Sequence, residues 1–262
     1  MPTVETAFGP IFYLSRGQGQ PPLIAVHGAG GLARHWGGQL SGLADLTQIV
    51  ALDLPGHGRS PGPTHTTVDQ GAERVLALLD ALAIPRAVLM GHSMGGAIVQ
   101  TLALRQPQRT AGLVLVGTGA RLRVHPDILS GILADWRGVT EMITAWSYAP
   151  EYAADLLARA AADLRTTSPA TLHADYSACD RFDLIAEAGR IAAPTLIIVG
   201  AQDRMTPPKY AEFLARTLPQ AQLTIIEQAG HSVMIEQPQL VNEAIRTHWP
   251  WLSTPPAAPS QL

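Results

Sequence analysis

The sequence predicts an α/β protein with a mostly parallel, doubly wound sheet. Short apolar runs rich in β-branched residues recur along the chain, bounded by glycine or proline. Their continuous apolar character is typical of strands buried on both faces, as in a parallel sheet. Between several of these runs lie longer segments with apolar residues at helical spacing, and strands that alternate with helices favour a doubly wound arrangement.

The first twenty residues show a different pattern, which predicts an antiparallel hairpin at the sheet edge. The runs Val4–Ala7 and Ile11–Ser15 flank the turn-forming pair Gly9-Pro10. Six buried strands are then expected at Leu23–Val26, Gln48–Leu52, Ala87–Met90, Leu113–Val116, Thr195–Val199 and Leu223–Ile226. Helices are expected at Val68–Leu82, Ala97–Leu104, Tyr210–Leu218 and Leu240–Trp249.

The alternation stops between residues 121 and 190. This stretch has no strand-like run, and its helical patches are Ile128–Trp136, Tyr152–Leu164 and Ala170–Cys179, broken by Gly138, Pro150 and Pro169. A helical insertion between two buried strands would form a cap over one end of the sheet. We therefore expect a core of residues 1–120 and 191–252 and a cap of residues 121–190. Residues 253–262 contain three prolines and no periodicity, so we expect a disordered tail.

Composition narrows the class of protein. Hydrophobic residues make up 47% and charged residues 15% of the chain, which excludes a disordered protein. The net charge of −3 gives no electrostatic reason to bind nucleic acid or an anionic membrane. No apolar run approaches the roughly 18 residues of a membrane span, and the N-terminus lacks the pattern of a secretory signal. We expect a cytoplasmic protein without a nucleic-acid or membrane partner.

Cysteine and histidine usage gives no sign of a metal site or a disulfide. Cys179 is the single cysteine, so an internal disulfide and a thiolate cluster are both excluded. The histidines outside the motifs below are scattered, with no pair four residues apart on a helix and no His-Glu-x-x-His run. We therefore expect neither a metal nor a cofactor.

The strongest chemical signal is the segment 91–96, Gly-His-Ser-Met-Gly-Gly, between an apolar strand and a helix. A strand, a tight turn and a helix are the setting of a nucleophile elbow. Gly91 and Gly95 leave room for the backbone to fold back, so that Ser93 projects its hydroxyl from a strained turn. The helix N-terminus offers the backbone N–H of Met94 to an oxyanion. The alternative is a serine in an ordinary glycine-rich turn.

A serine nucleophile needs a base that a third group orients. Asp203 follows the strand predicted at 195–199, and His231 follows the strand predicted at 223–226. The order serine, aspartate, histidine is the order that accompanies this elbow. Both residues would meet Ser93 at the carboxyl ends of the strands, where open α/β sheets bind ligands. Taken alone, each has a simpler interpretation as a turn or loop residue.

A glycine-rich loop, His27-Gly28-Ala29-Gly30-Gly31, follows the first buried strand. It can bring a second backbone N–H to the oxyanion, with Ala29 the first candidate and Gly30 the second. The competing interpretation is a phosphate-binding loop. That loop would need a Gly-Lys-Ser/Thr ending, and the nearest basic residue here is Arg34. The third glycine of a dinucleotide-binding fingerprint is absent as well. The loop therefore favours the oxyanion role.

Together these motifs resemble the α/β-hydrolase fold superfamily. The resemblance is carried by His27-Gly28, the elbow around Ser93, Asp203, Gly230-His231 and the stretch 53–60, Asp-Leu-Pro-Gly-His-Gly-Arg-Ser, and it extends from Val4 to Trp251. It implies an eight-stranded sheet, a cap inserted after the sixth strand, and acyl-serine chemistry. In that family the histidine at the position of His57 is structural, so we assign it no catalytic role.

The elbow also indicates a branch of the family. Members that resemble dehalogenases and epoxide hydrolases use an aspartate nucleophile, so Ser93 disfavours them. Members that hydrolyse carbon–carbon bonds commonly carry asparagine where His92 stands. His92-Ser93-Met94 is similar to the branch of carboxylesterases, lactonases and cofactor-free haloperoxidases.

We expect a serine hydrolase that cleaves small, mainly apolar carboxylic esters through an acyl-enzyme on Ser93. A lactonase, a carbon–carbon bond hydrolase, a cofactor-free perhydrolase and a slow-turnover ligand sensor that keeps the triad are the alternatives. Arg121 and Arg123, at the start of the cap, could meet a carboxylate, although solvated surface positions are the simpler interpretation. Residues expected to line the substrate pocket are Trp136, Met142, Trp146, Tyr148, Met205 and Val233.

Overall fold

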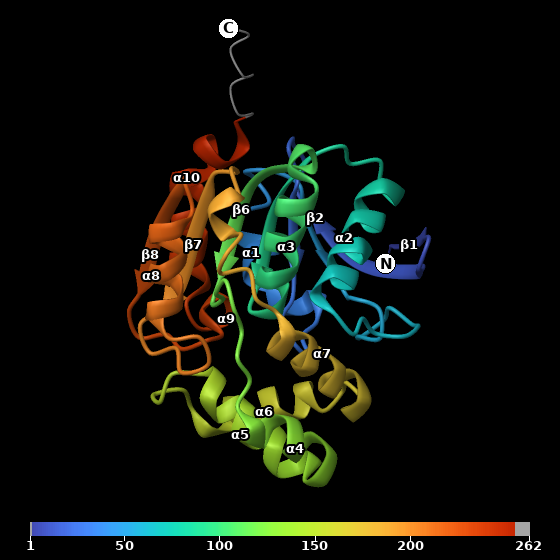
Figure 1. Cartoon of the computed structure of the whole chain (residues 1–262), viewed down its shortest axis with the longest axis vertical. Helices are drawn as coiled ribbons and strands as arrows, with labels where there is room; N and C mark the ends of the chain where they lie inside the picture. Colours follow the sequence, from blue (N-terminus) through green and yellow to red (C-terminus); the bar gives the residue numbers. More distant parts are fainter. Residues whose placement is uncertain (1, 255–262) are drawn as a thin grey trace, which may run out of the picture.

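Eight strands form one sheet within residues 2–254, the part of the chain that this computed structural model describes (Figure 1). Their spatial order is β1-β2-β4-β3-β5-β6-β7-β8. The β1–β2 and β2–β4 pairs are antiparallel and the other pairs are parallel, which confirms the predicted fold class and the N-terminal hairpin. The strands are β1 Thr3–Thr6, β2 Gly9–Arg16, β3 Leu23–Val26, β4 Ile49–Leu52, β5 Ala87–His92, β6 Thr110–Val116, β7 Thr195–Gly200 and β8 Ala221–Ile226.

The five strands β3 to β7 are buried along their whole length, as their uninterrupted apolar sequences predicted. Successive side chains of a strand point to opposite faces of the sheet. In β3, Ile24 and Val26 therefore enter one hydrophobic cluster, and Leu23 and Ala25 enter another. A strand with two apolar faces requires a cover on each side.

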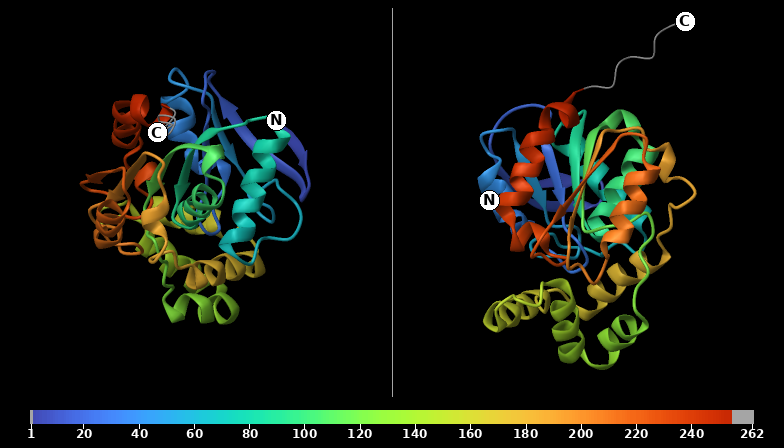
Figure 2. Two further views of the ribbon diagram at one scale, coloured as in Figure 1. Left: turned by 45° about the horizontal axis from the view of Figure 1, so that its top comes forward. Right: turned by 90° about the vertical axis from the view of Figure 1, so that its left-hand side faces the viewer.

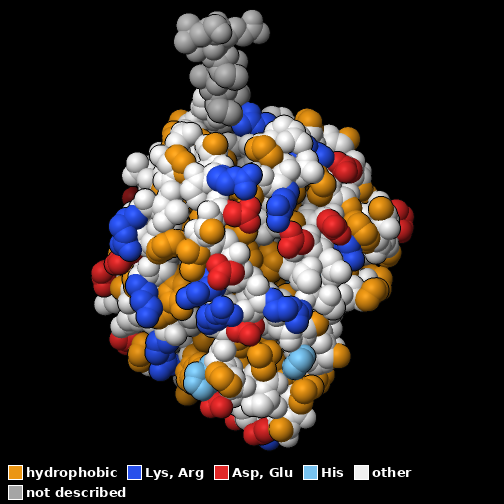
Figure 3. All heavy atoms as spheres, in the orientation of Figure 1, with side chains coloured by type: hydrophobic (Ala, Val, Ile, Leu, Met, Phe, Trp, Pro, Cys, Tyr) orange, Lys and Arg blue, Asp and Glu red, His pale blue; other side chains and the backbone are white. Residues whose placement is uncertain are grey.

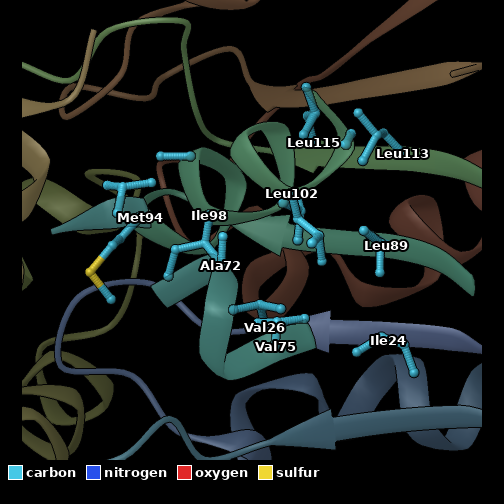
Figure 4. Packing of buried hydrophobic residues seen from close by; sticks show 14 of the residues in the cluster. Ile24, Val26, Ala72, Val75, Leu89, Met94, Ile98, Leu102, Leu113 and Leu115 are labelled. Atoms are coloured by element: carbon cyan, nitrogen blue, oxygen red, sulfur yellow. The ribbon is translucent and has the colours of Figure 1, made fainter. Parts of the chain in front are cut away.

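Helices supply that cover on both faces of the sheet (Figure 2). One face packs against α2 Val68–Ala81, α3 Met94–Arg105 and α8 Pro208–Thr217. The other packs against α1 Gly37–Gly42, α9 Val233–Glu236 and α10 Pro238–Ser253. Figure 4 shows the first face, where Val26 of the sheet lies close to Val75 of α2, and Leu89 lies close to Leu102 of α3. The short helices α1 and α9 were not predicted, because neither is long enough to show helical periodicity.

Four helices lie between β6 and β7 and form the cap below the core in Figure 1. They are α4 Pro126–Ala134, α5 Trp136–Ser147, α6 Ala154–Leu164 and α7 Pro169–Arg181. Ile132, Val139 and Leu172 are among the buried side chains of a small separate hydrophobic cluster inside the cap. The cap therefore has a small hydrophobic core of its own. The chain returns from the cap to the α/β core through residues 182–194, where Asp183 forms a β-bridge with Arg121.

Two of the residues expected to separate the helical patches lie in the first turn of a helix. Gly138 lies in the first turn of α5, where the Asp135 carboxylate accepts its N–H at 2.9 Å. Pro169 is the first residue of α7, a position where proline loses no helical hydrogen bond. Asp135 caps α5 and Ser168 caps α7. The cap by Asp135 starts α5 at Trp136, and the sequence did not predict this helix.

Helix α10 ends at Ser253, so the tail predicted for residues 253–262 begins one residue too early. Residues 255–262 lie outside the described part of the chain. Among residues 2–254, every helix is too short or too polar to cross a bilayer.

The packing of the central strand leads to a stability prediction. Leu89 of β5 is fully buried, whereas Leu240 of α10 is 45% exposed. We expect Leu89→Ala to lower the free energy of unfolding by about 3 kcal/mol, through lost burial and the cavity that remains. Leu240→Ala should change it by less than about 0.5 kcal/mol. Urea unfolding of the two variants measures both, and equal losses would contradict the packing described here.

Candidate active site

Ser93 occupies a strained turn between β5 and α3. Its φ of 51° and ψ of −114° lie where residues other than glycine are uncommon. The turn is crowded, because a Cβ on Gly95 would stand 2.2 Å from the carbonyl oxygen of Val26, and one on Gly91 would stand 2.2 Å from that of Gly95. Glycine at both positions lets β5 and α3 approach closely enough to present Ser93.

Hydrogen bonds to β6 and to the loop after it hold the strained residue in place. The Ser93 N–H donates to the Val116 carbonyl at 2.9 Å, and the Thr118 hydroxyl donates to the Ser93 carbonyl at 2.8 Å. The Ala97 N–H also donates to the Ser93 carbonyl, at 3.1 Å, as the first bond of α3. Surrounding structure of this kind is what allows an unfavourable backbone conformation to persist.

Asp203 and His231 meet at the carboxyl ends of β7 and β8. His231 Nδ1 lies 2.9 Å from Asp203 Oδ2, and both side chains are buried. The other carboxylate oxygen accepts the N–H groups of Met205 at 2.9 Å and Thr206 at 2.8 Å. The Thr206 hydroxyl donates to Asp203 Oδ2 at 2.9 Å. With its oxygens held by these donors, the carboxylate is fixed in the orientation that directs Oδ2 at the imidazole.

Ser93 and His231 line one cavity of about 100 Å³. Because Nδ1 of His231 faces Asp203, Nε2 is the ring nitrogen left for the cavity, and no hydrogen bond among residues 2–254 engages it. The structure therefore brings together the three side chains predicted as a triad, from the ends of three different strands. This is the arrangement in which an imidazole can take a proton from a hydroxyl while a carboxylate stabilises its charged form.

His92, the residue before Ser93, holds the backbone of His231. Its Nε2 lies 3.0 Å from the His231 carbonyl oxygen, an acceptor, so Nε2 carries the proton. Burial, and then the nearby His231, lower the pKa of His92 well below its ordinary value, so the ring stays neutral. In the sequence, His92 indicates only the branch of the family. Its position directly before Ser93 is the one signal of this second role.

Ala29, in the loop after β3, lines the same cavity. The peptide that joins Gly28 to Ala29 contains the Gly28 carbonyl and the Ala29 N–H. The Gly28 carbonyl oxygen lies 2.8 Å from His27 Nδ1 and accepts the Gly31 N–H at 2.9 Å. The N–H and carbonyl of a trans peptide point in opposite directions. The Ala29 N–H is thereby turned away from these donors. It has no acceptor within residues 2–254, and neither has the Met94 N–H at the start of α3.

Gly30, the second candidate for the oxyanion hole, is excluded because its N–H is already bonded. It donates to Asp175 Oδ2 at 2.8 Å, and the Gly30 carbonyl accepts the Thr167 hydroxyl at 3.2 Å. Both partners belong to the cap. The φ of Gly30 is +63°, and a Cβ there would lie 2.5 Å from Leu164 and 2.6 Å from Leu172, so the cap also fills the space beside it.

Asp175 is fully buried and forms an ion pair with His57 of the loop after β4. His57 Nε2 lies 2.8 Å from Asp175 Oδ2, the oxygen that also accepts the Gly30 N–H. Burial by itself lowers the pKa of His57, but attraction to Asp175 and the hydrogen bond to it outweigh burial, so the pKa is raised. The buried carboxylate thus has a cationic partner, as a buried charge requires. This position agrees with the structural role expected for His57.

Glu236 of α9 joins the histidine loop to the cap. Its two carboxylate oxygens accept the N–H of Gly230 at 3.0 Å and the N–H of Ala149 at 2.8 Å. Beside it, the Ser232 N–H donates to the carbonyl of Ser147, the last residue of α5. Burial raises the pKa of Glu236. The residues on both sides of His231 are therefore attached to the cap, and neither Glu236 nor Asp175 was identified from the sequence.

The six predicted pocket residues lie in four different places. Tyr148 lines the cavity beside Ser93 and His231. Trp146 and Met205 line a second cavity, of about 430 Å³, which Ser93 also borders. Trp136 and Met142 line neither cavity and pack against the core of the cap. The prediction for Val233 was wrong, because α9 turns this side chain into the core, and Met234 and Ile235 line the first cavity instead.

The polar groups of the first cavity are hydroxyls, imidazoles, backbone groups and one carboxylate, that of Asp163, which lies 2.7 Å from His35 Nε2. Burial raises the pKa of Tyr148 to about 12, although a hydrogen bond with Ser232 lowers it in part, so its hydroxyl stays protonated at neutral pH. Among residues 2–254 no three His, Cys, Asp or Glu side chains are grouped so that they could hold a metal ion.

The His57–Asp175 pair predicts how stability depends on pH. A raised pKa means that the folded protein holds the His57 proton more tightly than the unfolded chain does. The stabilisation is fully present below the ordinary histidine pKa of 6.5 and is lost as the pH rises through the raised value. We expect the difference in unfolding free energy between the wild type and His57→Gln to be largest near about pH 6 and to become smaller as the pH rises through the raised pKa.

Urea unfolding at a series of pH values measures this difference. His173→Gln, on α7 but outside the pair, controls for the loss of an imidazole. A difference between wild type and His57→Gln that grows with pH would contradict the assignment of an ion pair.

Three comparisons relate this geometry to known proteins. The dihydrolipoyllysine-residue acetyltransferase component of the acetoin cleaving system of Pseudomonas putida is 32% identical over 241 residues, 87% of this chain. The chain spans only 63% of the length of that relative. The putative carbamate hydrolase RutD of Pseudomonas syringae pv. syringae (strain B728a) is 31% identical over 260 residues, covering 90% of this chain and 95% of that protein. A solved thermophilic esterase has 33% identity and a TM-score of 0.85, covering 96% of this chain and 97% of its own.

The sequence profile described as "Alpha/beta hydrolase family" matches residues 23–244. That range contains the strands from β3 to β8 and all three side chains of the Ser93, Asp203 and His231 group. The chain therefore belongs to the alpha/beta hydrolase family.

Proposed function

We propose that this protein is a serine hydrolase that cleaves small carboxylic esters through an acyl-enzyme on Ser93. The observation that carries the proposal is the buried bond of 2.9 Å between His231 Nδ1 and Asp203 Oδ2, at the cavity that the strained Ser93 borders. A serine hydroxyl is a weak nucleophile at neutral pH, and this arrangement provides the base it needs. Ala29, which lines the cavity, and Met94, which follows Ser93, each have a backbone N–H without an acceptor among residues 2–254, and these two donors support acyl transfer over simple binding.

In the proposed reaction, Ser93 Oγ attacks the ester carbonyl while His231 Nε2 accepts the hydroxyl proton. Asp203 keeps the imidazole oriented and stabilises its positive charge. Collapse of the tetrahedral intermediate breaks the bond to the alcohol oxygen, which takes the proton from His231. Water then attacks the acyl-enzyme with His231 again as the base, and the acid and free Ser93 are released.

The N–H groups of Ala29 and Met94 would bind the negatively charged oxygen of each tetrahedral intermediate. Donors of this kind are effective when the protein fixes them before the reaction. For Met94 the fixed element is the first turn of α3. For Ala29 the neighbouring residues on both sides are fixed. Gly28 O accepts hydrogen bonds from His27 Nδ1 and the Gly31 N–H. Gly30 donates its N–H to Asp175 and accepts the Thr167 hydroxyl.

The surroundings of Ser93 support a substrate that is apolar next to the reacting ester. Ile143, Leu164 and Ile235 line the small cavity, and Ile128, Trp146 and Met205 line the larger one. Apolar walls with a few fixed polar groups are typical of small-molecule sites. The small volume of the first cavity favours a short group on that side of the ester.

Removing the nucleophile tests the proposal directly. We expect Ser93→Ala to lower kcat for p-nitrophenyl acetate and butyrate by at least about 10⁴-fold, because the hydroxyl that forms the acyl-enzyme is lost. Covalent labelling by a fluorophosphonate should disappear in the same variant. Steady-state kinetics over a series of acyl lengths, from acetate to hexanoate, measure the rate and the size of the pocket together.

Ser147→Ala is the matched control, because Ser147 lines the same cavity but donates its hydroxyl to the Ile143 carbonyl of its own helix. Its kcat should remain within about threefold of wild type. A Ser93→Ala protein that keeps near-normal turnover, or an equal loss in both variants, would refute the role of Ser93.

The hydrogen bonds between the cap and residues 27–31, the proposed oxyanion loop, give a second prediction. Thr167→Val keeps the shape of the side chain but removes the hydroxyl donated to Gly30 O. We expect kcat to fall about tenfold with KM changed less than about threefold, because the loop donor is less well fixed in the transition state. Thr171→Val is the matched control, because it removes a cap hydroxyl that accepts the Ser168 hydroxyl at 2.9 Å and lies 3.5 Å from Gly56 O but makes no bond to Gly30. Equal rate losses in the two variants, or a loss confined to KM, would argue against this role.

A further inference from the structure

The larger cavity extends from Ser93 to the surface between the core and the cap. Its volume is about 430 Å³, and apolar side chains such as Ile128, Trp146 and Met205 form much of its wall. Cap residues 122–128 lie on one side, and residues 204–210, which run from the loop after β7 into α8, lie on the other. A substrate bound at Ser93 therefore has room for an extension in this direction.

Three cationic side chains, Arg123, Arg204 and Lys209, also line this cavity, and all three are exposed. Lys209 is the only lysine of the chain. Within residues 2–254 none of the three has a carboxylate oxygen within 4.0 Å, whereas Arg121 and Arg216 nearby each have one. In Figure 3, Lys and Arg side chains gather on the face of the molecule just above the cap.

The acidic side chains around the cavity do not cancel this charge. No Asp or Glu is among the residues that line it. Asp180, close to Arg123, accepts the Val124 N–H at 3.1 Å, and Asp127 lies 3.6 Å from the exposed His125, which also lines the cavity. Arg123 and Arg204 donate to the backbone carbonyls of Asp180 and Ala145, which carry no net charge.

Unpaired cations at the rim of an apolar cleft create a positive potential that the low dielectric of the walls concentrates. Lys209 is the second residue of α8, so the positive end of the helix dipole adds to this potential. A neutral, purely apolar substrate would gain nothing from it. A carboxylate at the end of an apolar spacer would place its charge among the three cations while its ester lies at Ser93.

We propose that the preferred substrate is an ester or lactone that carries a carboxylate at the end remote from the scissile bond, bound by Arg123, Arg204 and Lys209. The proposal rests on the serine hydrolase function proposed above and refines its substrate class. It replaces a uniformly apolar substrate with one that is apolar near the ester and anionic at its far end.

Two pairs of substrates test the charge on either side of the ester. The first is mono-4-nitrophenyl glutarate and its terminal amide, with the charge on the acyl group. The second is 4-acetoxybutanoate and 4-acetoxybutanamide, with the charge on the alcohol. In one pair we expect kcat/KM of the wild type to be at least about tenfold higher for the carboxylate, chiefly through KM. This preference should weaken as salt is raised, since exposed charges are screened.

Lys209→Gln and Arg204→Gln should each reduce the ratio of kcat/KM, carboxylate over amide, at least about threefold. Arg216→Gln is the matched control, since Arg216 is on the same helix as Lys209 but pairs with Glu212 and does not border this cavity. It should leave the ratio unchanged.

The outcomes separate this inference from the proposed function. The carboxylate site is refuted if Ser93 hydrolyses carboxylate and amide at equal rates in both pairs. It is also refuted if the preference for the carboxylate remains in both variants. Neither result contradicts the proposed serine hydrolase function. If wild type hydrolyses none of the four compounds, the proposed function fails for these esters. Calorimetric binding of 4-acetoxybutanoate to Ser93→Ala, compared with the amide, then decides the carboxylate site by itself.

Discussion

The buried carboxylate of Asp175 is the interaction on which the arrangement of the site depends. It comes from the cap, yet one of its oxygens is shared by His57 and the Gly30 N–H, both in loops of the core. A charge removed from water must be paired and hydrogen-bonded, so α7 can lie only where both partners reach it. The carboxylate therefore fixes the position of the cap and the conformation of the oxyanion loop together.

The same relation holds on the other side of the site, where Glu236 connects the N–H groups of Gly230 and Ala149. The cap thus contacts the loop of the proposed base as well as the loop of the oxyanion donor. Ser93 is independent of these contacts, because its turn is held by β6 and the loop after it. The sheet holds the proposed nucleophile in place, and the cap orders the loops that carry the proposed base and oxyanion donor.

How much the sequence could predict depends on how local each feature is. The strands, the elbow and the positions of Asp203 and His231 follow from short motifs next to apolar runs, so they could be identified. Val233 could not be placed, because the direction of its side chain depends on the short helix α9 and the packing around it. Asp175 and Gly30 are 145 residues apart, and Glu236 is 87 residues from Ala149, so no local pattern shows these bonds.

The contacts at Gly30, Gly230 and Ser232 also bear on how ligands enter. Because the cap is hydrogen-bonded to the loops of the site, it cannot move away as a rigid body without disturbing those loops. The opening between residues 122–128 and 204–210 reaches Ser93 and offers ligands a route that leaves those bonds in place. For the same reason, a cap taken from a relative would preserve the conformation of these loops only under one condition. It would have to supply equivalents of Asp175 and Thr167, which bond Gly30, and of Ala149, which bonds Glu236.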